Sequence, residues 1–260
     1  MIKLNTMYCA DCLELMAEIP DKSIDMILCD LPYGHTQSDW DSIIPFDSLW
    51  LQYKRIIKDC GAIVLTASQP FTTDLINSAR DIFRYELIWI KNRGTGIFSA
   101  KTRPMKAHEN ICVFYKNSPC YNPQMDSGKP YRCKQGKQSK SFGLDTGKTI
   151  VTVNKGERYP LSYQFFVSTV GKNVHPTQKP VTLFEYLIET YTNTGDLVLD
   201  NCAGSFTTAI ACDNLNRNWI CIEKEPKYCD IGLQRINENR KRLGLSLLEN
   251  YTYYSFGTFL

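Results

Sequence analysis

The sequence has no long run of apolar residues. Its longest apolar runs are about six residues, whereas a helix needs about 20 such residues to cross a bilayer. The first residues, Met1 to Thr6, lack the apolar core of a secretory signal peptide and are typical of the start of a strand. We therefore expect a cytoplasmic protein that does not bind a membrane.

A second set of zinc ligands is also missing. Cys9 and Cys12 form a C-x-x-C pair, but no other ligand pair follows at the spacing of a zinc site. The simpler interpretation of the pair is two structural thiols at a junction between a strand and a helix. Most of the 11 cysteines lie in apolar stretches, where a thiol behaves as a small hydrophobic group. We predict reduced cysteines and no metal site.

The charge is unevenly distributed along the chain, although the net charge is only +3. Residues 116–172 contain ten Lys or Arg and three Asp or Glu, which leaves the rest of the chain net negative. A segregated basic segment is typical of a protein that binds a polyanion such as nucleic acid. A solvated loop is the alternative, and the composition alone favours neither.

Short apolar runs alternate with helical segments along the 260 residues. The runs are rich in β-branched and aromatic residues, which is typical of parallel strands buried on both faces; they span residues 24–29, 61–67, 85–91, 110–115, 196–200 and 218–222. Helices are predicted at residues 11–19, 46–58, 70–80, 180–192, 205–215 and 226–242. This alternation predicts a doubly wound α/β sheet, and only the stretch from 117 to 174 interrupts it, as an insertion would.

The end of the first apolar run carries a carboxylate and an aromatic ring, in Asp30-Leu31-Pro32-Tyr33. Leu31 precedes a proline, which biases its backbone towards extended angles. The Asp30 carboxylate and the Leu31 carbonyl could then accept both hydrogens of an exocyclic amine, while Tyr33 stacks on the ring that bears it. The alternative is an ordinary structural turn after a strand.

A second strand, ending at Asp200, leads through Ala203-Gly204-Ser205 into a helix. Such a turn lets a ligand approach the helix N-terminus closely. Glu223 ends the next strand, 19 residues after Gly204, where a carboxylate that binds ribose hydroxyls is expected. The two features together indicate a nucleotide-type ligand.

These segments resemble the motifs of a known enzyme family. Asp30-Leu31-Pro32-Tyr33 looks like the D-P-P-Y motif of amino-methylating DNA methyltransferases, and residues 197–208 are similar to their S-adenosylmethionine loop. His175 to Pro180 resembles the segment that closes over the methionine end of that cofactor, and Asp11 to Leu15 resembles the turn on its adenosine side. The order of the motifs resembles the permuted β group of adenine-N6 and cytosine-N4 DNA methyltransferases.

The resemblance implies a seven-stranded, mostly parallel Rossmann-like methyltransferase sheet. It divides the chain into a catalytic half (1–116), a basic target-recognition insertion (117–174), a cofactor-binding half (175–244) and an aromatic tail (245–260). It also implies a pocket scaffold role for His108-Glu109, for which a salt-bridged strand start is the alternative.

The resemblance further implies three sets of site residues. The catalytic set is Asp30, Leu31, Pro32 and Tyr33. The set that binds S-adenosylmethionine is Asp11, Cys12, Asp30, Thr177, Gln178, Lys179, Asp200, Cys202, Ala203, Gly204, Ser205, Phe206, Thr207 and Glu223. The set that contacts DNA is Arg93, Lys101, Arg103, Arg132, Lys134, Lys137 and Lys140.

Three residues depart from the family pattern. Leu31 replaces a proline, which keeps the carbonyl acceptor but loses one fixed φ angle. Cys202 stands where the family often has phenylalanine, and Phe206 where a second glycine is usual. A bulky ring at position 206 could narrow the approach to the cofactor.

The function that the sequence favours is transfer of a methyl group from S-adenosylmethionine to the N6 amine of a flipped-out adenine in double-stranded DNA. An aspartate at the first motif position fits the adenine branch better than the serine common in cytosine-N4 enzymes. Cytosine-N4 methylation, methylation of RNA or of a protein amide, and a nucleic-acid binding module with a vestigial cofactor site are the alternatives. A homodimer and a cognate restriction endonuclease stay open as further partners.

Overall fold

The computed structural model describes residues 2–34, 41–135, 150–168 and 178–254. Contacts divide the chain into two compact units, and each is described by itself. The larger unit consists of residues 1–122 and 162–260, and the smaller unit of residues 123–161. The smaller unit lies inside the segment that the sequence predicts as an insertion.

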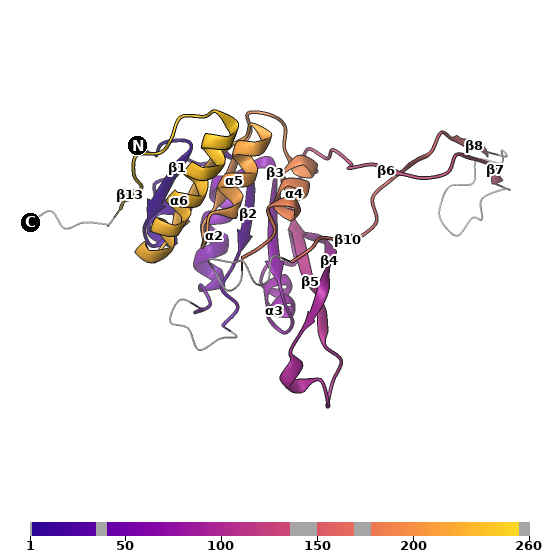
Figure 1. Cartoon of the computed structure of the whole chain (residues 1–260), viewed down its shortest axis with the longest axis horizontal. Coiled ribbons are helices and arrows are strands. Elements are labelled where there is room, and N and C mark those ends of the chain that lie inside the picture. Colours follow the sequence, from indigo (N-terminus) through magenta and orange to yellow (C-terminus); the bar gives the residue numbers. More distant parts are fainter. Residues whose placement is uncertain (1, 35–40, 136–149, 169–177, 255–260) are drawn as a thin grey trace, which may run out of the picture. The chain divides into compact units, whose positions relative to one another are not determined.

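A nine-stranded sheet forms the centre of the larger unit (Figure 1). Its strand order is β10-β4-β5-β3-β2-β11-β12-β1-β13. The strands are β1 (Thr6–Cys9), β2 (Ile24–Asp30), β3 (Ile57–Ala67), β4 (Phe83–Thr95), β5 (Lys106–Phe114), β10 (Tyr163–Phe165), β11 (Leu197–Asp200), β12 (Asn218–Glu223) and β13 (Thr252–Tyr253). The seven strands from β4 to β1 form the predicted sheet, and the two short strands β10 and β13 extend its edges.

One strand runs against the predicted direction. β5 pairs antiparallel with both β3 and β4, whereas all other neighbours in this sheet are parallel. The prediction that residues 110–115 form a parallel strand is therefore wrong. The cause is the short connection between β4 and β5, residues 96–105, because a parallel crossover needs about a dozen residues or more.

Six helices of the larger unit lie where the periodicity predicts them. They are α1 (Cys12–Ala17), α2 (Phe46–Ile56), α3 (Phe71–Ser78), α4 (Val181–Tyr191), α5 (Thr207–Leu215) and α6 (Pro226–Leu243). Asp11 caps α1 by accepting the backbone N–H groups of Leu13 and Glu14. At the end of α6, three basic side chains complement the helix dipole, and Gly244 takes the left-handed conformation that ends the helix.

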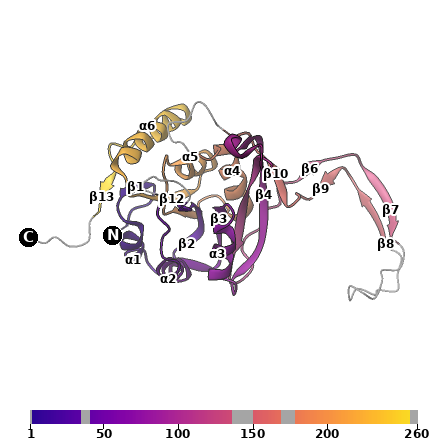
Figure 2. The same cartoon turned by 90° about the horizontal axis from the view of Figure 1, so that it is seen from below.

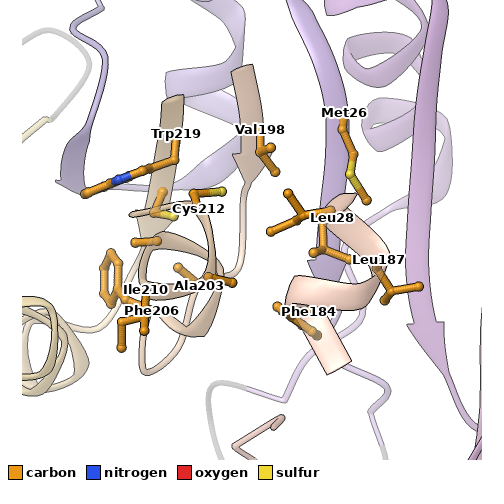
Figure 3. Packing of buried hydrophobic residues seen from close by; sticks show 14 of the residues in the cluster. Met26, Leu28, Phe184, Leu187, Val198, Ala203, Phe206, Ile210, Cys212 and Trp219 are labelled. Atoms are coloured by element: carbon orange, nitrogen blue, oxygen red, sulfur yellow. The ribbon is translucent and has the colours of Figure 1, made fainter. Parts of the chain in front are cut away.

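The helices cover both faces of the sheet (Figure 2). Side chains of α1, α2 and α3 pack on one face with Ile27 and Cys29 of β2. Side chains of α4, α5 and α6 pack on the other face with Met26 and Leu28, as Figure 3 shows in part. Successive residues of β2 therefore point into different cores, which explains why the four residues 26–29 at its centre are all apolar. The prediction of a doubly wound α/β fold is confirmed.

The C-terminal tail contributes to the edge of the sheet. β13 pairs parallel with β1, and the backbone N–H of Tyr254 donates to the carbonyl of Cys9 over 3.1 Å. Within the described ranges, no helix is both long and apolar enough to cross a membrane.

The smaller unit is built from two antiparallel strand pairs. β6 (Asp126–Ser127) pairs with β9 (Glu157–Arg158), and β7 (Tyr131–Gln135) pairs with β8 (Ile150–Asn154). The guanidinium of Arg158 lies 4.8 Å from the ring centroid of Tyr131. Of the residues predicted to contact DNA, Arg132 and Lys134 belong to β7, while Lys137 and Lys140 lie outside the described residues.

Candidate active site

The two motifs that lie about 170 residues apart in sequence are neighbours in the structure. β2, which ends at Asp30, pairs parallel with β11, which ends at Asp200. The chain leaves β2 towards β3 on one side and leaves β11 towards β12 on the other, so this is the topological switch point of the sheet. A cavity of about 570 Å³ opens there, and both motifs line it.

The cofactor half of the cavity contains two buried carboxylates. Glu223, at the end of β12, accepts the backbone N–H groups of Gly204 over 2.7 Å and of Glu225 over 2.9 Å. Asp200 accepts the backbone N–H of Cys202 over 3.1 Å and the hydroxyl of Thr208. Burial raises the pKa of Asp200 to about 6 and that of Glu223 to about 7, although these hydrogen bonds oppose the shift.

Phe206 does not narrow this cavity. Its side chain is fully buried among the core residues shown in Figure 3. It is absent from the cavity lining. A Cβ built on Gly232 of α6 would lie only 2.1 Å from Cδ2 of the phenylalanine ring. Phe206 has a φ of 60°, a left-handed conformation that glycine adopts most easily. The ring therefore fills space over α6, and the expectation that it narrows the approach is wrong.

The two cysteines of the C-x-x-C pair contact different partners. The hydrogen bond from Cys202 lowers the pKa of Cys12, and both of these residues line the cavity. The Sγ atom of Cys9 lies 3.8 Å from the carbonyl oxygen of Lys224. All 11 cysteines are free. In the part of the chain that the structure describes, no three His, Cys, Asp or Glu side chains are grouped to hold a metal ion.

The catalytic half of the cavity is centred on the Asp30 carboxylate. Its Oδ1 atom accepts the hydroxyl groups of Tyr33, over 2.8 Å, and of Thr66. Thr66 lies opposite Asp30 in the β2–β3 ladder, so the strand register positions this hydroxyl. The Tyr33 ring stacks on Phe71 of α3, with a centroid distance of 5.1 Å and an interplanar angle of 30°. Burial, and then the charges of Asp30 and Glu109, raise the pKa of Tyr33, which keeps its hydroxyl a donor.

The other oxygen of Asp30 accepts a hydrogen bond from the buried ammonium group of Lys179. Nζ of Lys179 lies 2.5 Å from Oδ2 of Asp30 and 3.5 Å from Oε2 of Glu109. Glu109 in turn pairs with Lys91. Burial alone would lower the pKa of Lys179, but the two carboxylates outweigh it and raise that pKa. We call these four side chains the charge cluster.

Most of the predicted cofactor residues share the cavity lining. Twelve of the fourteen line it, Phe206 does not, and Thr177 lies outside the described residues. All four predicted catalytic residues line it as well. Thr66 and Lys91 have no motif around them, so sequence reasoning missed them. The strand register brings Thr66 to Asp30, and Lys91 follows two residues after Trp89, the ladder partner of Glu109. Glu109 lines the cavity and is also salt-bridged, so its two interpretations are compatible.

The predicted DNA contacts of the larger unit lie outside the cavity. Arg93, Lys101 and Arg103 are exposed on the β4–β5 hairpin, which reaches beyond the other strands at the bottom of Figure 1. Thr95, in the stem of this hairpin, does line the cavity. The hairpin therefore rises from the rim of the site.

Comparison with known proteins agrees with this geometry. The chain is 30% identical over 266 residues to Type II methyltransferase M.HinfI of Haemophilus influenzae, which covers 90% of this chain and 69% of that protein. It is 28% identical over 259 residues to Type II methyltransferase M1.MboII of Moraxella bovis, covering 92% and 96%. The crystal structure of the M1.HpyAVI–SAM complex matches with a TM-score of 0.62 and 25% identity, covering 89% of this chain and 98% of that one.

A family model described as DNA methylase matches residues 24–234. The chain belongs to the N6/N4 DNA methylase family. This confirms the resemblance that the ordered motifs carry. The DNA methylase uses S-adenosylmethionine as its cofactor.

The residues of the cavity fit this cofactor chemically. S-adenosylmethionine combines a ribose with two hydroxyl donors and a positively charged sulfonium group. The cavity of the DNA methylase offers the Glu223 and Asp200 carboxylates beside the small residues that precede α5. Carboxylates accept hydroxyl hydrogen bonds and favour a nearby cation, so the acceptor set matches the ligand.

Proposed function

We propose that this DNA methylase transfers a methyl group from S-adenosylmethionine to the N6 amine of an adenine flipped out of double-stranded DNA. The observation that supports this most directly is that Asp30 and the Gly204 turn line one cavity at the switch point of the sheet. A base held by the first motif would lie beside a cofactor held by the second.

The cofactor half would hold S-adenosylmethionine mainly through Glu223 and the turn before α5. The Glu223 carboxylate would accept the ribose hydroxyls, while Asp11 and Cys12 would lie on the adenosine side. Gln178 and Lys179 would lie towards the methionine end. When bound, S-adenosylmethionine supplies a methyl group that its sulfonium charge already activates.

This assignment predicts that cofactor affinity depends on pH. The pKa of Glu223 is raised to about 7, so the protonated form dominates at pH 6 and the carboxylate at pH 8. Ribose hydroxyls donate to the carboxylate, so binding releases a proton and affinity should rise roughly tenfold over this range. Calorimetric titration with S-adenosylmethionine across the range measures the effect.

A matched pair of variants assigns the effect to one side chain. Glu223→Gln should bind the cofactor weakly and without this pH dependence. Glu225→Gln removes a carboxyl group that also lines the cavity and should keep the dependence. An affinity of the wild type that does not change between pH 6 and pH 8 would contradict the role of Glu223.

The catalytic half would hold the amine of the flipped base. A carboxylate offers about four lone-pair sites, and Lys179, Tyr33 and Thr66 use three of those of Asp30. The remaining site would accept one amine hydrogen, and the Leu31 carbonyl would accept the other. Both interactions make the nitrogen lone pair more nucleophilic and favour the positive charge that develops on it. Positioning of this kind can lower a barrier by about 7–11 kcal/mol.

The ring of Tyr33 would support the base from one side. Tyr33 lines the cavity, while Phe71 packs behind its ring and does not line it. Stacking of a base on an aromatic side chain contributes roughly 1–3 kcal/mol, which offsets much of the cost of extruding the base. Pro32 would fix the direction of the chain between the two motif side chains.

The basic segment would bind the DNA backbone. Replacing Lys134, Lys137 and Lys140 together with glutamine should weaken DNA binding and lower the slope of log K against log salt by roughly 2–3, because each phosphate contact contributes about 0.9. Fluorescence anisotropy with labelled duplex DNA, over roughly 50 to 300 mM salt, measures both the affinity and its salt slope.

The control is a second triple variant in the larger unit. Lys22, Lys54 and Lys58 are exposed lysines that pair with Asp59, Asp81 and Asp25. Their replacement by glutamine should leave the salt slope nearly unchanged. If both triple variants bind alike, the basic segment is not the DNA contact.

The proposal is tested by one incubation of the protein with radiolabelled S-adenosylmethionine and duplex DNA, followed by nucleoside analysis. N6-methyladenine supports it. N4-methylcytosine would instead establish the alternative branch of the family. Absence of any methylated nucleoside, together with absence of binding in the calorimetric titration with S-adenosylmethionine, would favour a nucleic-acid binding module.

A further inference from the structure

The tip of the β4–β5 hairpin exposes two apolar side chains. Ile97 and Phe98 form a single turn of 3₁₀ helix, Ile97–Ser99, between the two strands. The Ile97 side chain is 65% exposed and the Phe98 side chain is fully exposed. Phenylalanine is mostly buried in folded proteins, so a fully exposed ring on a projecting turn indicates a binding role.

The turn is structured rather than loose. The carbonyl oxygen of Ser99 accepts the backbone N–H groups of Thr102 and Arg103, each over 3.0 Å. The hydroxyl of Thr95 donates to the carbonyl of Lys106 over 3.2 Å, which closes the strand ladder below the turn. The hairpin therefore presents Phe98 in a defined place.

The charge around the tip has one sign. Residues 93–103 contain three basic side chains, all exposed, and no acidic one; they are Arg93, Lys101 and Arg103. Such a hairpin is complementary to a polyanion. Two copies of it would repel each other, which argues against the tip as a contact between two copies of this chain.

The tip is also close to the cavity. β4 runs in the same direction as β2 and β3, because β5 is antiparallel to both of its neighbours, so β4 ends at the same edge of the sheet as Asp30. Thr95 lines the cavity, and Phe98 follows three residues later, a span of at most about 10 Å. Successive bases on one strand are about 3.4 Å apart, so the tip lies within roughly three base steps of the cavity mouth.

We propose that the hairpin tip is a wedge, in which Phe98, supported by Ile97, enters the base stack of duplex DNA beside the base to be methylated. This inference rests on the proposed function. Apolar side chains that insert between base steps unstack and kink a duplex. The inserted ring occupies the space that the extruded base leaves, and the basic side chains hold the phosphates on either side.

The test compares two duplexes with the wild type and Phe98→Ala. The target site is first located by mapping methyl groups that the wild type adds to plasmid DNA. One duplex then carries the target base paired, and the other carries it opposite an abasic position, where opening the pair is no longer needed. Leu51→Ala, which removes another exposed apolar side chain outside the cavity lining, is the control.

Phe98→Ala should lower kcat/KM on the paired duplex about 10- to 100-fold, in line with the loss of one stacked ring, and less than about threefold on the opened duplex. Phe98→Trp should restore most of the activity, and the control should match the wild type. An equal loss on both duplexes, or no loss on either, overturns the wedge. The wedge is also overturned if sedimentation velocity shows that the wild type is a dimer and Phe98→Ala is a monomer.

Failure of the proposed methyl transfer and failure of the wedge give different results in this experiment. If the wild type methylates neither duplex, the proposed function fails, and the wedge fails with it. If the wild type methylates both duplexes and Phe98→Ala keeps the wild-type ratio between them, only the wedge fails.

Discussion

Asp30→Asn is expected to lower kcat on the order of 10³-fold while the affinity for S-adenosylmethionine changes little. The substitution keeps the shape of the side chain but removes the negative charge that favours positive charge on the target nitrogen. Loss of one such electrostatic group typically costs 10²- to 10³-fold in kcat, or about 3–4 kcal/mol. The asparagine also offers fewer acceptor sites for the amine hydrogen. Single-turnover methyl transfer with labelled cofactor measures the change.

The design separates loss of chemistry from loss of fold. Asp30→Asn leaves Lys179 with Glu109 as its remaining carboxylate partner, so thermal unfolding is measured beside activity. Asp47→Asn makes the same chemical change at the exposed first turn of α2 and should behave as the wild type. Wild-type turnover by Asp30→Asn would show that Asp30 is not catalytic.

Lys179→Met is expected to lower the free energy of unfolding by about 3–5 kcal/mol at neutral pH. Removing one partner of a buried ion pair leaves the other charge uncompensated, and here two carboxylates, Asp30 and Glu109, lose the same cation. Lys91 would still pair with Glu109, while Asp30 would lose its ammonium partner. Urea unfolding of the variant and the wild type measures the difference.

The pH dependence of this difference follows from the pKa shifts. The pKa of Lys179 is raised above its usual 10.5, so its stabilisation is complete below that pH and is lost as the pH rises through the raised value. Burial would raise the pKa of Glu109, but Lys179 and Lys91 lower it below its usual 4.5, so its stabilisation is present above that pH and is lost as the pH falls. The cluster should therefore stabilise the wild type evenly from about pH 5 to pH 10.

The stability of the Lys179→Met variant should depend on pH at the acidic end of this range. Without the Lys179 ammonium group, the effect of burial, which raises the pKa of Glu109, meets less opposition, so the stability deficit of Lys179→Met should shrink as the pH falls towards 5. Adding Glu109→Gln to the variant should recover part of the stability, and a double-mutant cycle measures that coupling. A deficit that stays constant with pH would mean that Lys179 acts through packing and not through its charge.

The sequence was sufficient to predict the order of strands and helices, because the patterns that indicate these elements are local. Apolar periodicity predicted the helices, and the ordered motifs predicted that Asp30 and Gly204 would meet at one rim, as the pairing of β2 with β11 confirms. What it could not supply are contacts set by tertiary packing. Lys179 and Asp30 are 149 residues apart, and no local pattern indicates that their side chains pair.

The direction of β5 and the place of Phe206 were predicted wrongly for the same reason. An apolar run of six residues looks alike in parallel and antiparallel strands, and only the short connection from β4 decides between them. A phenylalanine in a small-residue turn looks like an obstruction until the neighbouring helix is known. Here that helix offers a glycine beneath the ring.

The pairing of Phe206 with Gly232 has a consequence for how this enzyme could change by mutation. The Phe206 ring occupies the space that a side chain at position 232 would need, so neither position can be altered freely. Any side chain at 232 would have to displace the ring, while a smaller residue at 206 would leave a void over α6. Exchange of this turn with that of a related enzyme therefore requires the matching helix residue to be carried with it, even though that residue never lines the cavity.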